Sequence, residues 1–277
     1  MLYDTIRWEE KAISDAAKKK GVPHTLLDSK DLTLELSSRS EVDDHIVLQR
    51  CVSYFRNLHS TAALEHLGHR VVNNFRSAWT CGNKLFCTIA LMKGRIPTPR
   101  TSLAFTEDSA MKAIEEIGYP AVLKPVVGSW GRLSALVKDR DMASAILEDR
   151  EQMFPLYRVY YLQEFVKRPP RDIRSFVIGG ETVAAIYRTS EGGDWRTNTA
   201  RGGKASNCKI TQELAELSAR AAEVVGGEIV GVDLMESADG LVVHEVNNTT
   251  EFKNTVPATG VNIPSLMVDY LISAGKR

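Results

Sequence analysis

The sequence lacks any run of about 18 apolar residues, so we expect no membrane-spanning helix. It also lacks a charge excess, because 35 Lys and Arg residues balance 35 Asp and Glu residues, and no basic stripe is present. Nucleic acids and membrane surfaces are therefore not expected as partners. The N-terminus has no basic-then-apolar pattern of a signal peptide, and we expect a cytoplasmic protein.

Cysteine is scarce as well. The four cysteines are Cys51, Cys81, Cys87 and Cys208, and their spacing fits neither a disulfide framework nor a zinc site. We expect reduced thiols. Internal repeats and low-complexity segments are also absent.

Alternating elements fill the chain and indicate three parts. Residues 1–75 alternate short strands with helices, which predicts a small parallel sheet whose first strand is only a stub at Met1–Asp4. Residues 76–158 read as an α+β module that carries a glycine-rich loop between two strands. Residues 159–277 read as a second α+β module with two hairpins and two helices, one over Thr211–Val225, where Leu214, Leu217 and Ala221 recur at helical spacing, and one over Ile263–Ala274. The predicted fold class is therefore α/β (α+β) with an N-terminal domain and two further subdomains.

A hairpin predicted over residues 228–247 carries three side chains with oxygen ligands. If Ala238–Gly240 forms a three-residue loop, Asp233 lies opposite Glu245 and Asn247 lies on the same face. A two-residue loop would place the two carboxylates on opposite faces. Oxygen ligands of this kind suit Mg²⁺. The alternative is an ordinary polar side of an antiparallel sheet that faces solvent.

The segment Val127–Arg132 (VGSWGR) is rich in glycine and follows a predicted strand. Gly128 and Gly131 allow backbone N–H groups to approach phosphate oxygens, and Lys124 adds a positive charge just before them. The Walker A pattern is absent. The alternative is a plain hairpin turn in which Trp130 covers the core.

Arginines recur in the C-terminal part, where they can bind carboxylates or phosphates through two hydrogen bonds. Arg174 and Arg188 flank a predicted turn at Gly179–Gly180, and Arg201 lies in the polar stretch 198–203. A two-residue turn would place Arg174 and Arg188 on opposite faces, and the register stays open. Solvated edge strands are the alternative interpretation.

Taken in order, these motifs resemble those of the ATP-grasp ligases over nearly the whole chain. The segments that carry a closer resemblance are GSWGR (128–132), PPRDIRSFVIG (169–179), NTARGG (198–203) and EVNNTTEFKNT (245–255). They are similar to the LysX and ArgX ligases of lysine and arginine biosynthesis. These enzymes join α-aminoadipate or glutamate to the C-terminal Glu of the acidic carrier protein LysW.

The resemblance implies a role for each motif. It implies that ATP is bound by Lys84, Lys124, Gly128, Ser129, Trp130, Gly131, Arg132, Leu133, Ser134, Gln163, Glu164, Phe165, Val166, Asp172, Arg174 and Asn198. It implies two Mg²⁺ ions at Asp233, Glu245 and Asn247, and catalytic roles for Arg174 and Arg188. It implies an amino-acid pocket made of Arg188, Thr199, Ala200, Arg201, Gly202, Gly203, Glu251, Phe252, Lys253, Asn254 and Thr255.

The resemblance also indicates the substrate. Aminoadipate ligases carry Asn and a small residue after Glu-Phe-Lys, as Asn254-Thr255 does here, whereas glutamate ligases carry Gly-Phe. The two amino acids differ by one methylene, which packing distinguishes by about 1–3 kcal/mol. Glutamate, or both amino acids, is therefore the alternative, and a non-catalytic nucleotide-binding protein is a remoter one. We expect a homo-oligomer, and residues 191–194 depart from the family as a small insertion.

Overall fold

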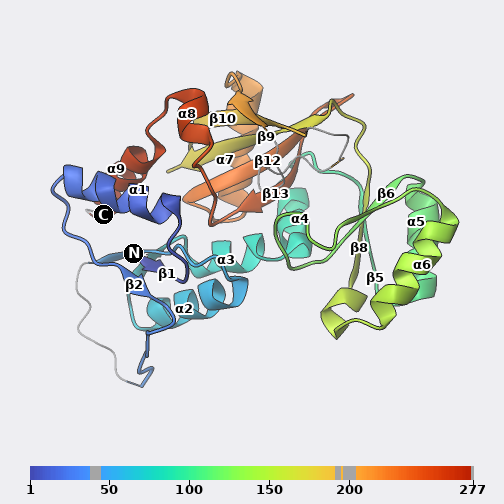
Figure 1. Ribbon diagram of the computed structural model, residues 1–277, viewed down its shortest axis with the longest axis horizontal. Helices are drawn as coiled ribbons and strands as arrows, with labels where there is room; N and C mark the ends of the chain where they lie inside the picture. Colours follow the sequence, from blue (N-terminus) through green and yellow to red (C-terminus); the bar gives the residue numbers. More distant parts are fainter. Residues whose placement is uncertain (38–44, 191–194, 196–203, 276–277) are drawn as a thin grey trace.

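The structure is a computed structural model that describes residues 1–37, 45–190, 195 and 204–275. These residues form a five-stranded sheet, a four-stranded sheet and two two-stranded sheets. In Figure 1 the four-stranded sheet and its two helices lie at one end of the molecule, and the N-terminal part lies at the other, below the five-stranded sheet. Among the described helices, none is long and apolar enough to cross a bilayer.

The N-terminal part contains the predicted parallel pairing, in strands of two or three residues. Its elements are β1 (Leu2–Tyr3), α1 (Trp8–Lys19), β2 (Leu27–Asp28), β3 (Ile46–Leu48), α2 (Tyr54–His66), β4 (Arg70–Val72) and α3 (Phe75–Cys81). β1 pairs in parallel with β2 and β3 with β4, and a parallel bridge between Leu2 and Gln49 joins the pairs. The stub of a first strand is confirmed. The sequence did not predict α3, and α2 begins at Tyr54, before Ser60, where the sequence pattern predicts the start of a helix over Ser60–Gly68.

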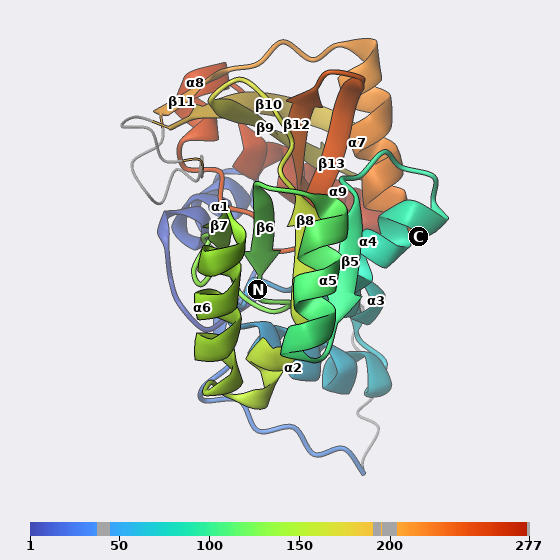
Figure 2. The ribbon, with the colours of Figure 1, turned by 90° about the vertical axis from the view of Figure 1, so that its right-hand side faces the viewer.

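The four-stranded sheet has the order β5-β8-β6-β7, and all its pairings are antiparallel. Its elements are β5 (Thr101–Ala104), α5 (Glu107–Ile117), β6 (Ala121–Lys124), β7 (Ala135–Val137), α6 (Arg140–Glu151), the 3₁₀ turn η1 (Pro155–Arg158) and β8 (Tyr160–Glu164). Figure 2 shows α5 and α6 side by side in front of the strands. Their apolar sides form one core with the sheet, which leaves the opposite face for the cleft.

The five-stranded sheet has the order β11-β10-β9-β12-β13. Its strands and associated helices are α4 (Lys84–Lys93), β9 (Arg171–Ile178), β10 (Glu181–Thr189), β11 (Lys204–Asn207), α7 (Gln212–Val224), β12 (Ile229–Ser237), β13 (Gly240–Asn247), α8 (Thr255–Thr259) and α9 (Ile263–Ala274). Alternation along β9 separates two cores: Val177 packs with α4 and α7, whereas Phe176 and Ile178 pack with α1 and α9. The face that carries Phe176 also presents Arg174, closer to the start of the strand.

Candidate active site

A β-bulge in the last hairpin decides where the predicted metal-ligating side chains point. Ser237 pairs with Gly240, so the loop has two residues, and the predicted three-residue loop is wrong. Asp233 nevertheless pairs with Glu245, because the register shifts between Asp233 and Leu234 and leaves His244 as the extra residue. The two carboxylates therefore face each other as expected, although the reason given for that expectation does not hold.

A second bulge brings two arginines to one face. Ile178 pairs with Glu181 across the two-residue Gly179–Gly180 turn, which alone would have separated Arg174 from Arg188. The register shifts between Thr182 and Ala184, so that Arg188 lies opposite Asp172 and Ile186 lies opposite Arg174. Residues directly opposite each other share a face of the sheet. The open question about these arginines is thereby answered: both point into the same cleft.

These arginines form a buried ion network with two aspartates. Arg174 donates from Nε and Nη2 to the two Oδ atoms of Asp233, at 2.7 Å each. Arg188 binds Asp172 in the same bidentate manner and also lies 3.2 Å from Asp233 Oδ2. Burial alone would raise the pKa of Asp233, but Arg174 and Arg188 hold it well below its usual range. Burial would likewise lower the pKa of Arg188, and Asp233 and Asp172 raise it.

The predicted metal ligands lie together at the edge of this network. Glu245 lies 3.6 Å from Lys84 Nζ, and Asn247 Nδ2 approaches Asp233 Oδ2 at 3.4 Å. Burial would raise the pKa of Glu245, but Lys84 contributes most to lowering it. Two carboxylates and an amide oxygen suit Mg²⁺, which accepts oxygen ligands and keeps several waters. No group of three or more His, Cys, Asp or Glu side chains in the described part of the chain is arranged to hold a metal, so any ion here depends on Asn247, water and bound phosphates as further ligands.

Lys84 connects this edge to the glycine-rich loop. The side chain of Asn83 caps α4 by accepting from Leu85 N and Phe86 N, and Lys84 N donates to the Val126 carbonyl at 2.8 Å. Lys84 Nζ then donates to the carbonyl oxygen of Gly128 at 2.6 Å. The N-terminus of α4 thus holds a cation between the loop and Glu245.

The loop that follows β6 has several residues in the left-handed region, including Trp130 (φ 58°) and Gly131 (φ 64°). Trp130 lines a cavity of about 650 Å³, and the guanidinium group of Arg132 lies over the Trp130 ring, 4.8 Å from its centroid. The ring therefore borders the cleft, and the alternative in which it covers the core does not describe this loop.

Lys124 and Gln163 meet in the same cleft from adjacent strands, β6 and β8. Lys124 Nζ donates to Gln163 Oε1 at 2.6 Å, and Gln163 donates in turn to Thr101 and Tyr161. Burial lowers the pKa of Lys124 to about 8. Because the Gln163 amide is neutral, the Lys124 ammonium group can still pair with an anionic group of a ligand in this cleft.

Two cavities meet at the two arginines of the ion network, Arg174 and Arg188. The larger has a volume of about 650 Å³ and the smaller about 280 Å³. Residues that line both are Arg7, Arg174, Arg188 and Glu251. Predicted residues that line the larger cavity are Lys84, Lys124, Gly128, Ser129, Trp130, Gly131, Arg132, Ser134, Gln163, Glu164, Phe165, Val166, Asp172, Arg174, Arg188, Asp233, Glu245, Asn247 and Glu251.

The smaller cavity contains most of the predicted amino-acid pocket that the structure describes. Lys253, Asn254 and Thr255 line it, and Thr255 is buried. Of the predicted residues in the described ranges, Leu133 and Phe252 line neither cavity, and Phe252 packs against Trp8 instead. Asn198, Thr199–Gly203 and the insertion at 191–194 lie outside the described residues.

Some lining residues escaped the sequence reasoning. His244 lines the larger cavity because the bulge turns it there, and burial, followed by Lys124, lowers its pKa to about 4. Arg7, Trp8 and Glu9 line the smaller cavity although they lie more than 150 residues before its other members. Strand periodicity does not reveal a bulge, and no local sequence pattern reveals a contact between segments so far apart in the chain.

Comparisons with known proteins agree on the fold. Residues 81–271 match the RimK-like ATP-grasp domain, and residues 1–80 match the LysX preATP-grasp domain. The structure is similar to a RimK domain ATP-grasp protein from Sphaerobacter thermophilus, with 26% identity, a TM-score of 0.78 and coverage of 98% of this chain and 99% of the other. It also shares its fold with the ATP-grasp ligase PsnB, at 18% identity, a TM-score of 0.75 and coverage of 99% and 96%. These matches place the chain in the class of ATP-grasp ligases.

Two groups of relatives are more specific. The α-aminoadipate–LysW ligase LysX of Saccharolobus solfataricus is 41% identical over 266 residues, which cover 95% of this chain and 96% of the relative. The glutamate–LysW ligase ArgX of Sulfurisphaera tokodaii is 33% identical over 273 residues, which cover 98% and 96%. The chain belongs to the LysX and ArgX family of ATP-grasp ligases.

Proposed function

We propose that this enzyme joins the α-amino group of α-aminoadipate to the γ-carboxylate of the C-terminal Glu of LysW, in lysine biosynthesis. The observation that carries the proposal is the shared wall: Arg174, Arg188 and Glu251 border both cavities. A nucleotide and an acceptor carboxylate in the larger cavity would therefore meet an amino acid from the smaller one at these residues. Identity of 41% to a LysX ligase supports α-aminoadipate over glutamate.

ATP is the proposed phosphoryl donor in the larger cavity. Lys84, Lys124 and the backbone of Gly128–Ser134 would contact its phosphates, and Gln163–Val166, Asp172 and Asn198 would contact the rest of the nucleotide. Asp233, Glu245 and Asn247 would hold two Mg²⁺ ions, which neutralise charge on a transferring phosphoryl group. In the free protein Arg174 offsets the charge of Asp233, and Lys84 offsets that of Glu245. Bound Mg²⁺ would neutralise these carboxylates instead, and the Arg174 and Lys84 side chains could then bind phosphate oxygens.

The proposed reaction has two steps. Transfer of the terminal phosphoryl group to the carrier's carboxylate gives an acyl phosphate and ADP. The amine of the amino acid then attacks the acyl carbon, phosphate leaves, and an isopeptide bond forms. Arg174 and Arg188 would stabilise the negative charge that develops on the acyl oxygen. The glycine-rich loop would exclude water, which would otherwise hydrolyse the acyl phosphate.

The smaller cavity suits an amino acid with two carboxylates. Among the described residues, its titratable lining consists of Arg7, Arg174, Arg188, Lys253, Glu9 and Glu251, so cations exceed carboxylates in this part of the lining. Thr199–Gly203 would complete the pocket. The proposal also includes a division of the chain into three parts, a cytoplasmic location and a homo-oligomer.

One experiment tests the proposed function directly. The enzyme is incubated with LysW, MgATP and either α-aminoadipate or glutamate, and the mass gained by the carrier is measured. We expect the mass increase of aminoadipate minus water, with a faster rate than for glutamate. A faster reaction with glutamate would support the ArgX alternative, and release of ADP with neither amino acid attached would reject both.

Selectivity is expected to depend on Asn254 and Thr255. Replacement of this pair by Gly-Phe fills space beside a pocket of about 280 Å³ at the buried position 255. We expect the ratio of kcat/KM for aminoadipate to that for glutamate to fall on the order of tenfold to a hundredfold, because a pocket discriminates by about this factor between substrates that differ by one methylene. Competition between the two amino acids in one reaction, read by carrier mass, measures this ratio. An unchanged ratio would place selectivity elsewhere in the pocket.

A further inference from the structure

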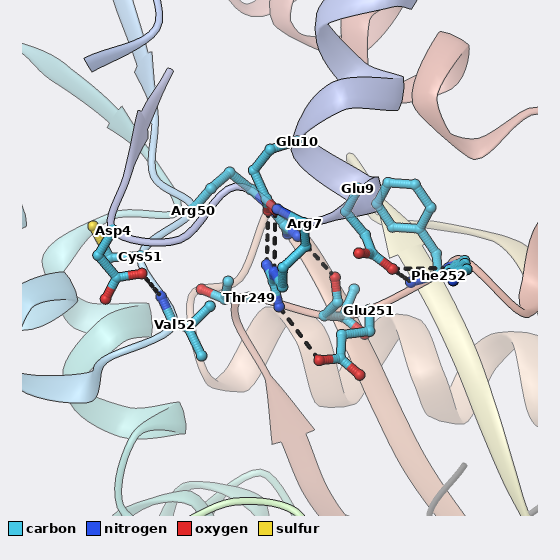
Figure 3. A network of polar contacts seen from close by, with 12 residues as sticks. Asp4, Arg7, Glu9, Glu10, Arg50, Cys51, Val52, Thr249, Glu251 and Phe252 are labelled. Carbon is cyan, nitrogen blue, oxygen red and sulfur yellow. Dashed lines mark hydrogen bonds and ion pairs between the residues drawn. The ribbon is translucent and has the colours of Figure 1, made fainter. Parts of the chain in front are cut away.

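Four consecutive residues, Thr250 to Lys253, are held by side chains from the first 50 residues, and the last three of them belong to the predicted amino-acid pocket (Figure 3). The Thr250 carbonyl accepts from Arg50 Nη2 at 3.1 Å, and Glu251 Oε1 lies 3.4 Å from Arg7 Nη1. The next two backbone N–H groups, of Phe252 and Lys253, both donate to Glu9 Oε1, at 3.1 and 2.9 Å. Each residue from 250 to 253 therefore has a partner in the N-terminal part.

The N-terminal side chains are themselves fixed by one another. Glu10 accepts from Arg7 Nε and Nη2, at 3.1 and 2.7 Å, and from Arg50 Nε at 2.9 Å, while Arg7 Nη1 and Arg50 Nη2 reach the segment. Glu9, Glu10 and Arg50 are at most 3% exposed. Glu10 thus lies between the two guanidinium groups and holds both of them in place beside the segment.

Acidic residues in the first turn of a helix usually only stabilise that helix through its dipole. Glu9 is in the first turn of α1, but its hydrogen bonds lead away from α1 to a segment 243 residues distant. That segment lies between β13 and α8, where no strand pairing satisfies its backbone N–H groups. Glu9 supplies the acceptor that a neighbouring strand would otherwise provide.

The contact continues to the end of the pocket. Thr255 N donates to the Phe252 carbonyl at 2.9 Å. Phe252, whose own N–H donates to Glu9, therefore anchors the first residue of α8. Trp8 adds an edge-on contact with the Phe252 ring, at 5.9 Å between centroids. The position of Thr255 thus depends on Glu9 through one intervening residue.

We propose that Glu9, supported by the Arg7–Glu10–Arg50 cluster, is a positioning residue for the amino-acid substrate. It fixes the backbone of residues 252 and 253 and, through it, the Asn254–Thr255 end of the pocket. This inference rests on the proposed function for the identity of the amino acid, but the positioning itself is a property of the free protein. Part of the pocket's selectivity is then set by a residue at the other end of the chain.

The test compares Glu9→Met, which loses the acceptor, with Glu9→Gln, which retains an Oε1 acceptor. In the free protein, hydrogen exchange at the Phe252 and Lys253 amides should rise on the order of tenfold or more in Glu9→Met and stay near wild type in Glu9→Gln. In the reaction with LysW, the KM for the amino acid should rise on the order of tenfold in Glu9→Met, because a displaced pocket wall weakens binding. The KM for ATP and kcat should change by less than about threefold, since no ATP contact is altered.

Glu65→Met is the matched control, because Glu65 Oε1 also accepts a backbone N–H, that of Phe75, at 2.7 Å, outside both cavities. It should alter neither the exchange at 252–253 nor the amino-acid KM. Unchanged exchange in Glu9→Met, or raised exchange with an unchanged amino-acid KM, overturns the proposal. If Glu9→Met does not fold, Glu9→Asp, which keeps the charge but is shorter, gives the same comparison. A wild type that joins neither amino acid refutes the proposed function, while the exchange result still decides the positioning.

Discussion

Replacement of Asp233 by Asn is expected to lower ADP release on the order of 1,000-fold or more. Asp233 lies at the centre of the site: Arg174 binds both its oxygens, Arg188 lies 3.2 Å away, and Asn247 approaches it at 3.4 Å. The Asn side chain keeps the shape but removes the charge that orients both arginines and that would hold a cation. ADP release in the presence of carrier, amino acid and MgATP measures the effect.

The variant is expected to stay folded. The Asn carbonyl still accepts from Arg174, and Arg188 keeps its two 2.7 Å bonds to Asp172. Asp239→Asn is the matched control, since Asp239 lies at the exposed tip of the same hairpin and should retain full activity. A thermal unfolding curve close to that of wild type, together with lost turnover, assigns the loss to the site. Turnover near the wild-type rate would reject the role of Asp233.

Much of the fold follows from local patterns. The helix α7 was predicted because Leu214, Leu217 and Ala221 recur at helical spacing, and the same residues pack in the core with the five-stranded sheet. The helix α9 has the predicted bounds, Ile263–Ala274. Short strands such as β5 and the helix α3 were missed, since their few residues show no clear period and tertiary contacts stabilise them.

The site was predictable in its residues but not in its geometry. Asp233 and Glu245 stood out as facing carboxylates, but a bulge at His244 rather than a longer loop brings them together. The same holds for Arg174 and Arg188, which a bulge near Val183 turns to one face. A bulge depends on packing on both sides of a strand, and a single residue changes every pairing beyond it. Sequence alternation alone cannot fix such a register.

A final prediction concerns Lys124, whose pKa burial lowers to about 8 from its usual 10.5. In the free protein above pH 8 the amine is mostly uncharged, whereas bound phosphates favour the ammonium form. Nucleotide binding should therefore take up a proton above pH 8, and the affinity should fall with rising pH, on the order of tenfold per unit. Titration calorimetry with MgADP at pH 8.5, in buffers of different ionisation enthalpy, measures the proton uptake.

Lys124→Met is expected to weaken nucleotide binding at pH 7 on the order of a hundredfold and to abolish this proton uptake, because the only change is the loss of a titrating cation beside Gln163.

The effect of pH on protein stability has the opposite sign to its effect on nucleotide affinity. Between pH 8 and 10.5 the unfolded chain holds the Lys124 proton and the folded protein does not, so this group makes the free energy of unfolding of wild type rise with pH there. Lys124→Met should lack that rise, which denaturant unfolding at several pH values detects. Lys138→Met, an exposed lysine beyond β7, should behave as wild type in both experiments. Equal proton uptake by wild type and Lys124→Met would show that another group carries the titration and that Lys124 stays charged in the free protein.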